Sequence, residues 1–134
     1  MKKLLDLYRS FRPFTEQEAW TLFKLAAIIE ACGWTLLVTG ILAHRYITPA
    51  SDIPVAIAGR THGTLFLVYI MAVVVLSPSL RWSWPRTIIA GAASVPPYGS
   101  LIFELWAAEH RRHASYQHMN RLITYRLLLA ETSR

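Results

Sequence analysis

The feature that most constrains this chain is an apolar run over residues 63–80, eighteen residues without a charge. Within it, residues 65–76 are apolar all round a helix, whereas the surface helix of a soluble protein has a polar face at 3.6-residue spacing. Only 16% of the 134 residues are charged, against roughly 25% in soluble domains. The run therefore favours a membrane-spanning helix over the rival interpretation, the core helix of a soluble all-α domain.

Two further stretches are apolar enough to cross a bilayer. Residues 31–43 carry no charge, and apolar residues extend this stretch back to Trp20 with Lys24 and Glu30 as interruptions, while residues 87–103 are also uncharged. A helix needs about 20 mainly apolar residues to cross a hydrocarbon core, and in lipid its backbone must satisfy its own hydrogen bonds. The sequence therefore predicts an all-α fold, a bundle of three transmembrane helices at about 16–43, 53–77 and 85–106.

Local signals place the ends of these helices. Thr15 and Glu18 have the spacing of a capping box, which predicts a helix start near Glu16. The second helix is expected to begin near Pro54, because Ser51 or Asp52 precedes it as a cap and proline is tolerated in the first turn.

Basic amphipathic arms flank the predicted transmembrane domain, residues 15–106. Residues 1–14 place apolar side chains at helical spacing opposite basic ones, and residues 107–134 repeat the arrangement. The apolar face of the second arm consists of Met119, Leu122, Ile123, Leu127 and Ala130. Such helices bind membrane surfaces, so the expected partners are the lipid bilayer and its anionic headgroups. Nucleic acid is not expected, because no recognised nucleic-acid module is present.

Orientation is poorly determined for a three-span topology, because basic residues then fall on both sides. One side receives Lys2, Lys3, Arg9, Arg12, Arg81 and Arg86, and the other receives Arg45, Arg60, Arg111, Arg112, Arg121, Arg126 and Arg134. The short loops and the first helix, which count most in the positive-inside rule, favour a cytoplasmic N-terminus. No cleavage pattern of a secretory signal peptide follows the N-terminal arm, so the first span is expected to be retained.

Glu30 and His62 are the two ionisable side chains expected at depth. A charged residue at the centre of a span costs roughly 2.5 to 3.5 kcal/mol, so Glu30 should be either neutral or paired. His62 lies in the second predicted helix, at a depth that differs from that of Glu30 by roughly one helical turn if the two helices are antiparallel. The sequence predicts that these two side chains form an intramembrane polar pair.

Small residues near this pair favour close helix packing. Gly33 follows Glu30 by three positions, and Gly59 and Gly63 flank His62 in a small-xxx-small pattern. Glycine lets two helix backbones approach closely. We therefore expect Gly33, Gly59 and Gly63 to form the helix contact that brings Glu30 and His62 together.

A helix break is expected in the third predicted span. Pro96 and Pro97 remove two backbone N–H groups, and Gly99 allows the backbone to bend. The carbonyl groups that lose their donors need others, for which Ser94, Tyr98, a water or His62 are candidates. The break is interpreted either as a static kink or as a hinge that lines a ligand path. At the far end of this helix, an ion pair between Arg60 and Glu104 is expected.

Other chemistry has little support in the sequence. Cys32 is the single cysteine, so neither an internal disulfide nor a cysteine-based metal site is predicted. His110, His113 and His118 near Glu109 fit a solvated tail better than a metal site. Nucleophilic triads, P-loops and dinucleotide-binding loops are not found. We expect no enzyme activity, no metal and no cofactor.

The order of these residues resembles a bacterial membrane-protein family, domain of unknown function 3817. The resemblance covers about residues 23–112, and its most recurrent features are His62-Gly63 and Pro97-Tyr98-Gly99. Further matching positions are Glu30, Gly33, Pro54, Gly59, Arg81, Trp82 and Glu104. The resemblance implies a multi-pass protein with three spans in the bacterial inner (plasma) membrane, and it supplies no activity. The longer amphipathic arms of this chain depart from the family pattern.

Two functions are consistent with these features. In the first, the protein acts by helix association, as a homo-oligomer or as an accessory subunit of a membrane complex, because its small residues suit a partner helix. In the second, it is a proton or small-ion carrier or channel-like protein that uses Glu30 and His62 as relay groups, with the broken helix lining the path.

Overall fold

All regular secondary structure in the described part of the chain is helical. The computed structural model describes residues 2–47, 49 and 51–132, and the side chains of Lys2 and residues 127–132 are outside the description. Five helices follow one another in this part: α1 (Lys2–Ser10), α2 (Glu16–Tyr46), α3 (Ile53–Leu76), α4 (Trp84–Ala92) and α5 (Gly99–Thr132). They belong to two compact units, Met1–Glu104 and Leu105–Arg134. The all-α prediction is confirmed for the described residues.

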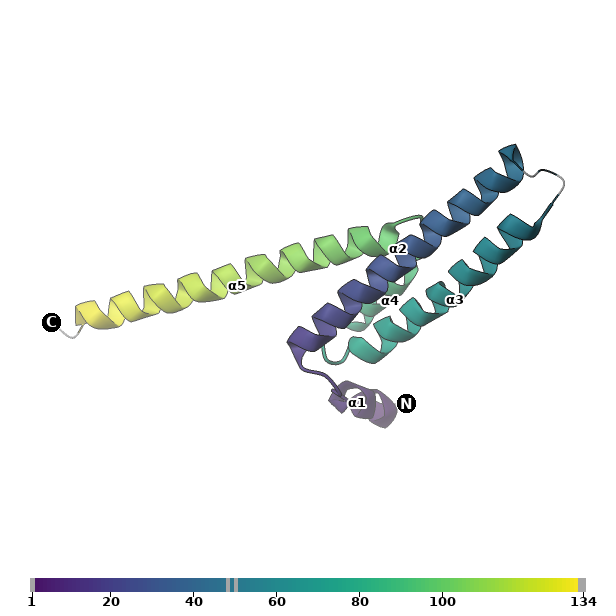
Figure 1. Cartoon of the computed structure of the whole chain (residues 1–134). Helices are drawn as coiled ribbons and strands as arrows, with labels where there is room; N and C mark the ends of the chain where they lie inside the picture. The colour runs from purple at the N-terminus through teal and green to yellow at the C-terminus, as the bar shows by residue number, and fades with distance from the viewer. Residues whose placement is uncertain (1, 48, 50, 133–134) are drawn as a thin grey trace. The chain divides into compact units, whose positions relative to one another are not determined.

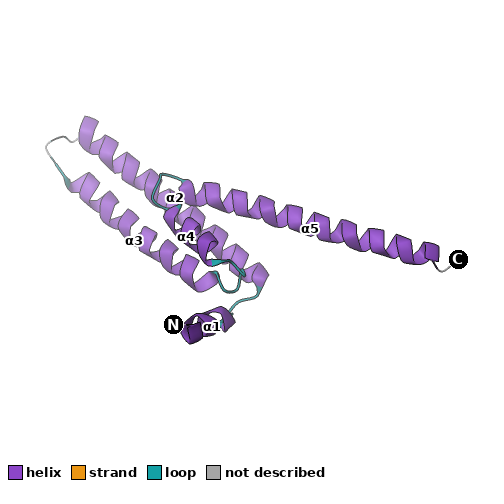
Figure 2. Ribbon diagram, turned by 180° about the vertical axis from the view of Figure 1, so that it is seen from behind, coloured by secondary structure: helices purple, strands orange, loops and turns teal. Residues whose placement is uncertain are grey.

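The long helices α2 and α3 form an antiparallel pair, side by side in Figures 1 and 2. Small side chains make the close contact possible, because a Cβ atom at Gly40 would lie 2.5 Å from the Cβ of Ala58 and 2.9 Å from the carbonyl oxygen of Pro54. Such a separation is too short for any side chain, so only glycine fits at position 40.

Both helices of this pair are long and apolar enough to cross a membrane. In the most apolar stretch of each, only 28% of α2 and 17% of α3 is buried inside the protein. A core helix of a soluble protein would be mostly buried, whereas these helices expose apolar side chains such as Ile29 and Leu67. The exposed surface is the kind that lipid tails cover, which argues against the soluble interpretation.

The helix starts follow the sequence signals. Thr15 and Glu18 form the predicted capping box: the Glu18 N–H donates to the Thr15 hydroxyl (3.3 Å), and the Thr15 N–H donates to the Glu18 carboxylate (2.9 Å). At α3, Asp52 occupies the cap position without a side-chain cap bond, and the hydroxyl of Ser51 accepts from the Ile53 N–H at 3.4 Å. Ser51 is therefore the side chain that serves the start of α3.

The turn after α3 is closed by a left-handed residue. Arg81 has φ 55°, its N–H donates to the carbonyl of Pro78 (3.2 Å), and the Trp82 N–H donates to the carbonyl of Ser77 (3.0 Å). These two bonds are those of a Schellman motif, which ends a helix and reverses the chain direction. The motif directs the chain from α3 back along the bundle into α4.

The predicted single helix over 85–106 is wrong. In its place the chain forms the nine-residue α4, an irregular segment at residues 93–98 and the start of α5. Nine helical residues rise only about 13.5 Å, less than half of a hydrocarbon core. The prolines therefore separate two helices where a kink within one helix was expected.

These two helices run in opposite directions along α2, so residues 84–104 form a helical hairpin. From Tyr98 onward, the contacts of the chain move toward the start of α2: the Tyr98 hydroxyl lies 3.3 Å from that of Thr35, and the Phe103 ring lies 6.2 Å from that of Phe23. The Phe103 ring is also 5.5 Å from that of Trp82, which precedes α4. The hairpin thus enters and leaves at one end of the α2–α3 pair.

The second unit is the exposed, charged continuation of α5. Met119, Leu122 and Ile123 are each more than half exposed, every residue over 112–126 is exposed, and the side chains of Leu127 and Ala130 lie outside the described residues. The predicted tail histidines also lie in this unit, where the His113 Nε2 atom is 3.0 Å from the Glu109 carboxylate.

Candidate functional site at the helix break

Glu30 is a fully buried carboxyl group on α2, and α5 supplies its partner. The Ser100 hydroxyl donates to the Glu30 Oε2 atom and lies 3.3 Å from the backbone carbonyl of Ala27. Both Glu30 and Ser100 have an exposed fraction of 0%. Because Ser100 is in the first turn of α5, the carboxyl group lies near the positive end of that helix dipole. The Glu30–Ser100 contact therefore fastens the returning arm of the hairpin to α2.

His62 does not pair directly with Glu30. Its ring lies 4.5 Å from the Trp34 indole, centroid to centroid, and its Nδ1 atom is 3.1 Å from the position of a Cβ atom on Gly33. Within the described chain, neither a hydrogen bond nor an ion pair joins Glu30 to His62. In place of the predicted pair, the two side chains lie in two adjacent layers of the bundle. One layer holds Glu30, and the other holds the His62 imidazole, which packs on Gly33, three residues further along α2 than Glu30.

Two buried polar atoms in these layers have no hydrogen-bond partner among the residues that the structure describes. They are the Glu30 Oε1 atom and the His62 Nδ1 atom, and neither is accessible from outside. An unpaired polar group in an apolar interior costs about 1 to 3 kcal/mol. The site thus has unused hydrogen-bonding capacity on both predicted relay groups.

A tryptophan supports the irregular segment between α4 and α5. The Trp34 indole N–H donates to the backbone carbonyl of Ser94 (3.2 Å), and the Val95 N–H donates to the carbonyl of Ala92 (3.1 Å). Carbonyl groups released by a broken helix need such donors in a low-dielectric interior. Of the predicted donors, Ser94 does serve a carbonyl at the break, because its hydroxyl donates to the carbonyl of Gly91 (2.6 Å), whereas Trp34 was not among the predicted donors.

The tight turn at the helix break requires a glycine at position 99. A Cβ atom at this position would collide with the carbonyl oxygen of Ala93 and with the Cγ atom of Pro96. Pro97 and Tyr98 connect these residues, and Tyr98 adopts the left-handed conformation with φ 61°. The Pro96, Pro97 and Gly99 residues singled out in the sequence thus lie together at the reversal.

The predicted packing glycines separate into two groups. Gly33 lies in the α2–α3 contact, where a Cβ atom would be 3.1 Å from atoms of His62 and Leu65. At Gly59 and Gly63, by contrast, no described atom other than the neighbouring residues and backbone of α3 itself lies within 4 Å of the Cβ position. The expectation that Gly59 and Gly63 pack against α2 is therefore wrong, and their flank of α3 is uncovered.

Arg60 and Glu104 do not form the expected pair. Glu104 follows Phe103, which lies near the start of α2, whereas Arg60 is in the second turn of α3, near the end of α2. Among the residues that the structure describes, no ion pair joins the two. The prediction failed because of the reversal: a continuous third helix would have carried Glu104 to the end of the bundle where Arg60 lies.

Aromatic rings close the end of the bundle where the hairpin enters. The Phe23 ring lies 5.0 Å from Trp82, 6.1 Å from Tyr69 and 6.2 Å from Phe103, and the Tyr69 hydroxyl donates to the carbonyl of Ala90 at 2.9 Å. Rings from α3, from α5 and from the link before α4 thus surround the buried Phe23 of α2. This aromatic cluster and the Glu30–Ser100 bond hold the hairpin at two levels.

Ser100 and Trp34 are the site residues that sequence reasoning missed. The indole N–H of Trp34 gave a signal, because a tryptophan within a span needs an acceptor for that group. Ser100 gave a weaker sequence signal, because it is a hydroxyl residue in the first turn after the prolines. Their partners could not be assigned without the direction of α5. For metals, no group of three or more potential ligand side chains is found among the described residues.

Comparisons with known proteins agree with a membrane location. A family model with the description "Domain of unknown function (DUF3817)" matches residues 20–109. A Streptomyces coelicolor protein named "Putative membrane protein SCO5905" is 41% identical over 86 residues, which are 63% of this chain and 10% of that protein. The chain thus spans about a tenth of the length of that relative. No solved structure matches the chain.

The Glu30–Ser100 contact predicts a stability difference between two serines of α5. Ser100→Ala should lower the free energy of unfolding by about 1 to 3 kcal/mol, because it leaves a buried carboxylate oxygen without its donor. Ser115→Ala is the matched control, since that exposed hydroxyl donates only to the carbonyl of Arg111 in its own helix. Unfolding by a denaturing detergent, followed by circular dichroism, measures both. Equal stability of the two variants would contradict the proposal that the Glu30–Ser100 hydrogen bond holds α5 against α2.

Proposed function

Since the chain belongs to the family described as Domain of unknown function (DUF3817), we propose its function from the geometry: it is a membrane protein that acts by binding other transmembrane helices, without catalysis. The partner is a second copy of the chain, in a homo-oligomer, or a helix of a membrane complex in which the protein is an accessory subunit. The observation that carries this proposal is the uncovered flank of α3 at Gly59 and Gly63.

The charge distribution supports a specific topology in place of three crossings. We propose that α2 and α3 cross the bacterial inner (plasma) membrane, while residues 84–104 enter and leave on one side. The N-terminal arm, the link before α4 and the C-terminal arm then share that side, with Lys2, Lys3, Arg9, Arg12, Arg81, Arg86, Arg111, Arg112, Arg121, Arg126 and Arg134. Arg45 and Arg60 lie toward the opposite end. The positive-inside rule makes the basic side cytoplasmic.

The glycine flank has the properties of a helix-binding surface. The other close-packing glycines, Gly33 and Gly40, already serve the α2–α3 contact inside the unit. Gly59 and Gly63 are spaced so that they lie on one side of α3, and both are partly exposed. In lipid, helices associate through close packing at small residues, because no hydrophobic force drives them together. A partner helix at this flank would gain contacts that lipid chains cannot reproduce.

The length of the Streptomyces coelicolor relative also supports an accessory role, in which this region works together with other parts of a larger protein. The matched region accounts for 10% of that protein, so there it is joined to much additional sequence.

Substitutions at the glycines test the association. Gly63→Leu should abolish the oligomer or the complex while the monomer keeps its helicity and stability, because position 63 touches nothing within the described unit. Gly40→Leu should instead unfold the α2–α3 pair. Cys32→Leu, a small-to-large change at an exposed position of α2, is the matched control. Cross-linking in native membranes and native mass spectrometry measure the assembly. An unchanged assembly with Gly63→Leu would contradict the proposal.

A second candidate function is a proton or small-ion carrier or channel-like activity. It is favoured by the unpartnered Glu30 Oε1 and His62 Nδ1 atoms, which lie in adjacent layers of the bundle beside a broken helix. Ionisable groups at membrane depth mark proton and ion paths in many membrane proteins, and broken helices often line such sites.

Flux measurements distinguish this candidate from association. If Glu30 and His62 relay protons, Glu30→Gln and His62→Ala should each abolish pH-dependent flux in proteoliposomes and leave the oligomer intact. The exposed pair Glu109 and His113 offers matched controls, so Glu109→Gln and His113→Ala should retain full flux. Flux that persists in both buried-site variants would remove the carrier function and leave association standing.

A further inference from the structure

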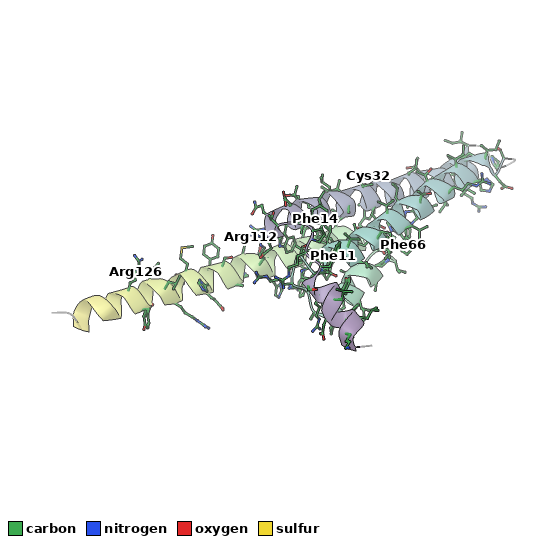
Figure 3. All side chains as sticks on the ribbon, turned by 90° about the horizontal axis from the view of Figure 1, so that it is seen from below. Phe11, Phe14, Cys32, Phe66, Arg112 and Arg126 are labelled. Atoms are coloured by element: carbon green, nitrogen blue, oxygen red, sulfur yellow. The ribbon has the colours of Figure 1, made fainter. Side chains whose placement is uncertain are left out.

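An apolar groove lies between the N-terminal helix and the bundle. Its volume is about 790 Å³, within the range of small-molecule sites. The lining residues include Leu4, Leu7, Tyr8 and Phe11 of α1, Val74 of α3 and Trp84 of α4. Figure 3 shows Phe11 and Phe14 where α1 meets the bundle. The groove is therefore built by three helices that are distant in the sequence.

Tyr8 fixes one wall of this groove. Its hydroxyl donates to the backbone carbonyl of Val74 (2.5 Å) and lies 2.6 Å from the Ser77 hydroxyl. Its ring stacks on the Trp84 indole with the centroids 5.4 Å apart. These contacts attach α1 to the ends of α3 and α4, so the groove is preformed and does not depend on a ligand to assemble it.

The remaining apolar face of α1 has no cover. Leu4 is 73% exposed, Leu7 is 69% exposed and Phe11 is 56% exposed, and all three line the groove. Contiguous exposed apolar surface of this kind marks a binding site for an apolar ligand. A hydrocarbon chain matches such a surface, because the groove is open and its lining is almost entirely apolar.

Positive charge accompanies the groove on the same short segment. Lys3, Arg9 and Arg12 are all exposed and are immediate sequence neighbours of lining residues. Asp6 is the single acidic residue among residues 2–15. The ligand that complements this combination has an apolar chain and an anionic head, and the cationic groups would suit its phosphate.

We propose that the groove binds one anionic phospholipid. One acyl chain lies along Leu4, Leu7 and Phe11, and the phosphate is bound by Arg9 and Arg12. This inference rests on the proposed membrane location and is independent of helix association, so an oligomer that survives Gly63→Leu would not affect it. The lipid completes the packing of α1 against the bundle at the membrane surface.

Native mass spectrometry of the purified full-length protein tests the site, with phosphatidylglycerol and phosphatidylcholine added to detergent micelles as probes. The wild type should retain one phosphatidylglycerol in preference to phosphatidylcholine. Val74→Trp should fill the groove and reduce retention at least tenfold, whereas Val68→Trp, an exposed valine of the same helix outside the groove, should not. Leu7→Gln provides a second variant that leaves the bundle untouched and should also lose the lipid.

The charge contribution is measured separately. Arg9→Gln together with Arg12→Gln should reduce the preference for phosphatidylglycerol by about 30-fold, since each basic residue near a lipid surface contributes about 1 kcal/mol, or about fivefold. Arg60→Gln, which lies in α3 away from the groove, should leave the preference unchanged. Equal retention of both lipids by the wild type, retention unaffected by both Val74→Trp and Leu7→Gln, or a second protein chain in place of the lipid would overturn the proposal.

Discussion

The arrangement of this protein depends on how the chain reverses direction between α4 and α5. Irregular backbone exposes carbonyl groups that lipid cannot satisfy. Here, an indole N–H from Trp34 reaches the carbonyl of Ser94, and the buried carboxyl of Glu30 accepts from Ser100 directly after the reversal. Both supporting side chains come from α2. Helix α2, one of the two candidate membrane spans, is therefore also the scaffold on which the hairpin is built.

The reversal between α4 and α5 changes how the positive-inside rule applies to the basic residues of this chain. With three crossings, the two basic arms lie on opposite sides and their positive charges nearly cancel in the orientation rule. With the proposed re-entrant hairpin, the N-terminal arm and the arginines around α4 would share one side, and the orientation rule would then favour that side as cytoplasmic. In the same unit, Gly59 and Gly63 are uncovered, since no described atom beyond the neighbouring part of α3 lies within 4 Å of their Cβ positions. The reversal thus links the proposed topology and the environment of Glu30.

Sequence reasoning predicted the features that depend on local physics. The apolar runs of α2 and α3, the capping box at Thr15 and the helix break at the prolines require only hydropathy, cap chemistry and the lost N–H groups. It failed where the direction after the break mattered. Two prolines interrupt a helix but do not specify the angle that follows, so the partners of Glu30 and Glu104 were wrong. The angle is set by Gly99, which has no room for a side chain, and by aromatic contacts between distant segments.

The central claim, a re-entrant hairpin held by α2, is tested most directly by labelling single cysteines from each side of the membrane. In a Cys32→Ser background, Ser10→Cys, Ser51→Cys and Ser115→Cys mark the N-terminal arm, the α2–α3 turn and the C-terminal arm. A membrane-impermeant thiol reagent should reach positions 10 and 115 only in inverted vesicles and position 51 only in right-side-out ones. Labelling of position 115 from the same side as position 51 would contradict the account, because the chain would then cross the membrane a third time.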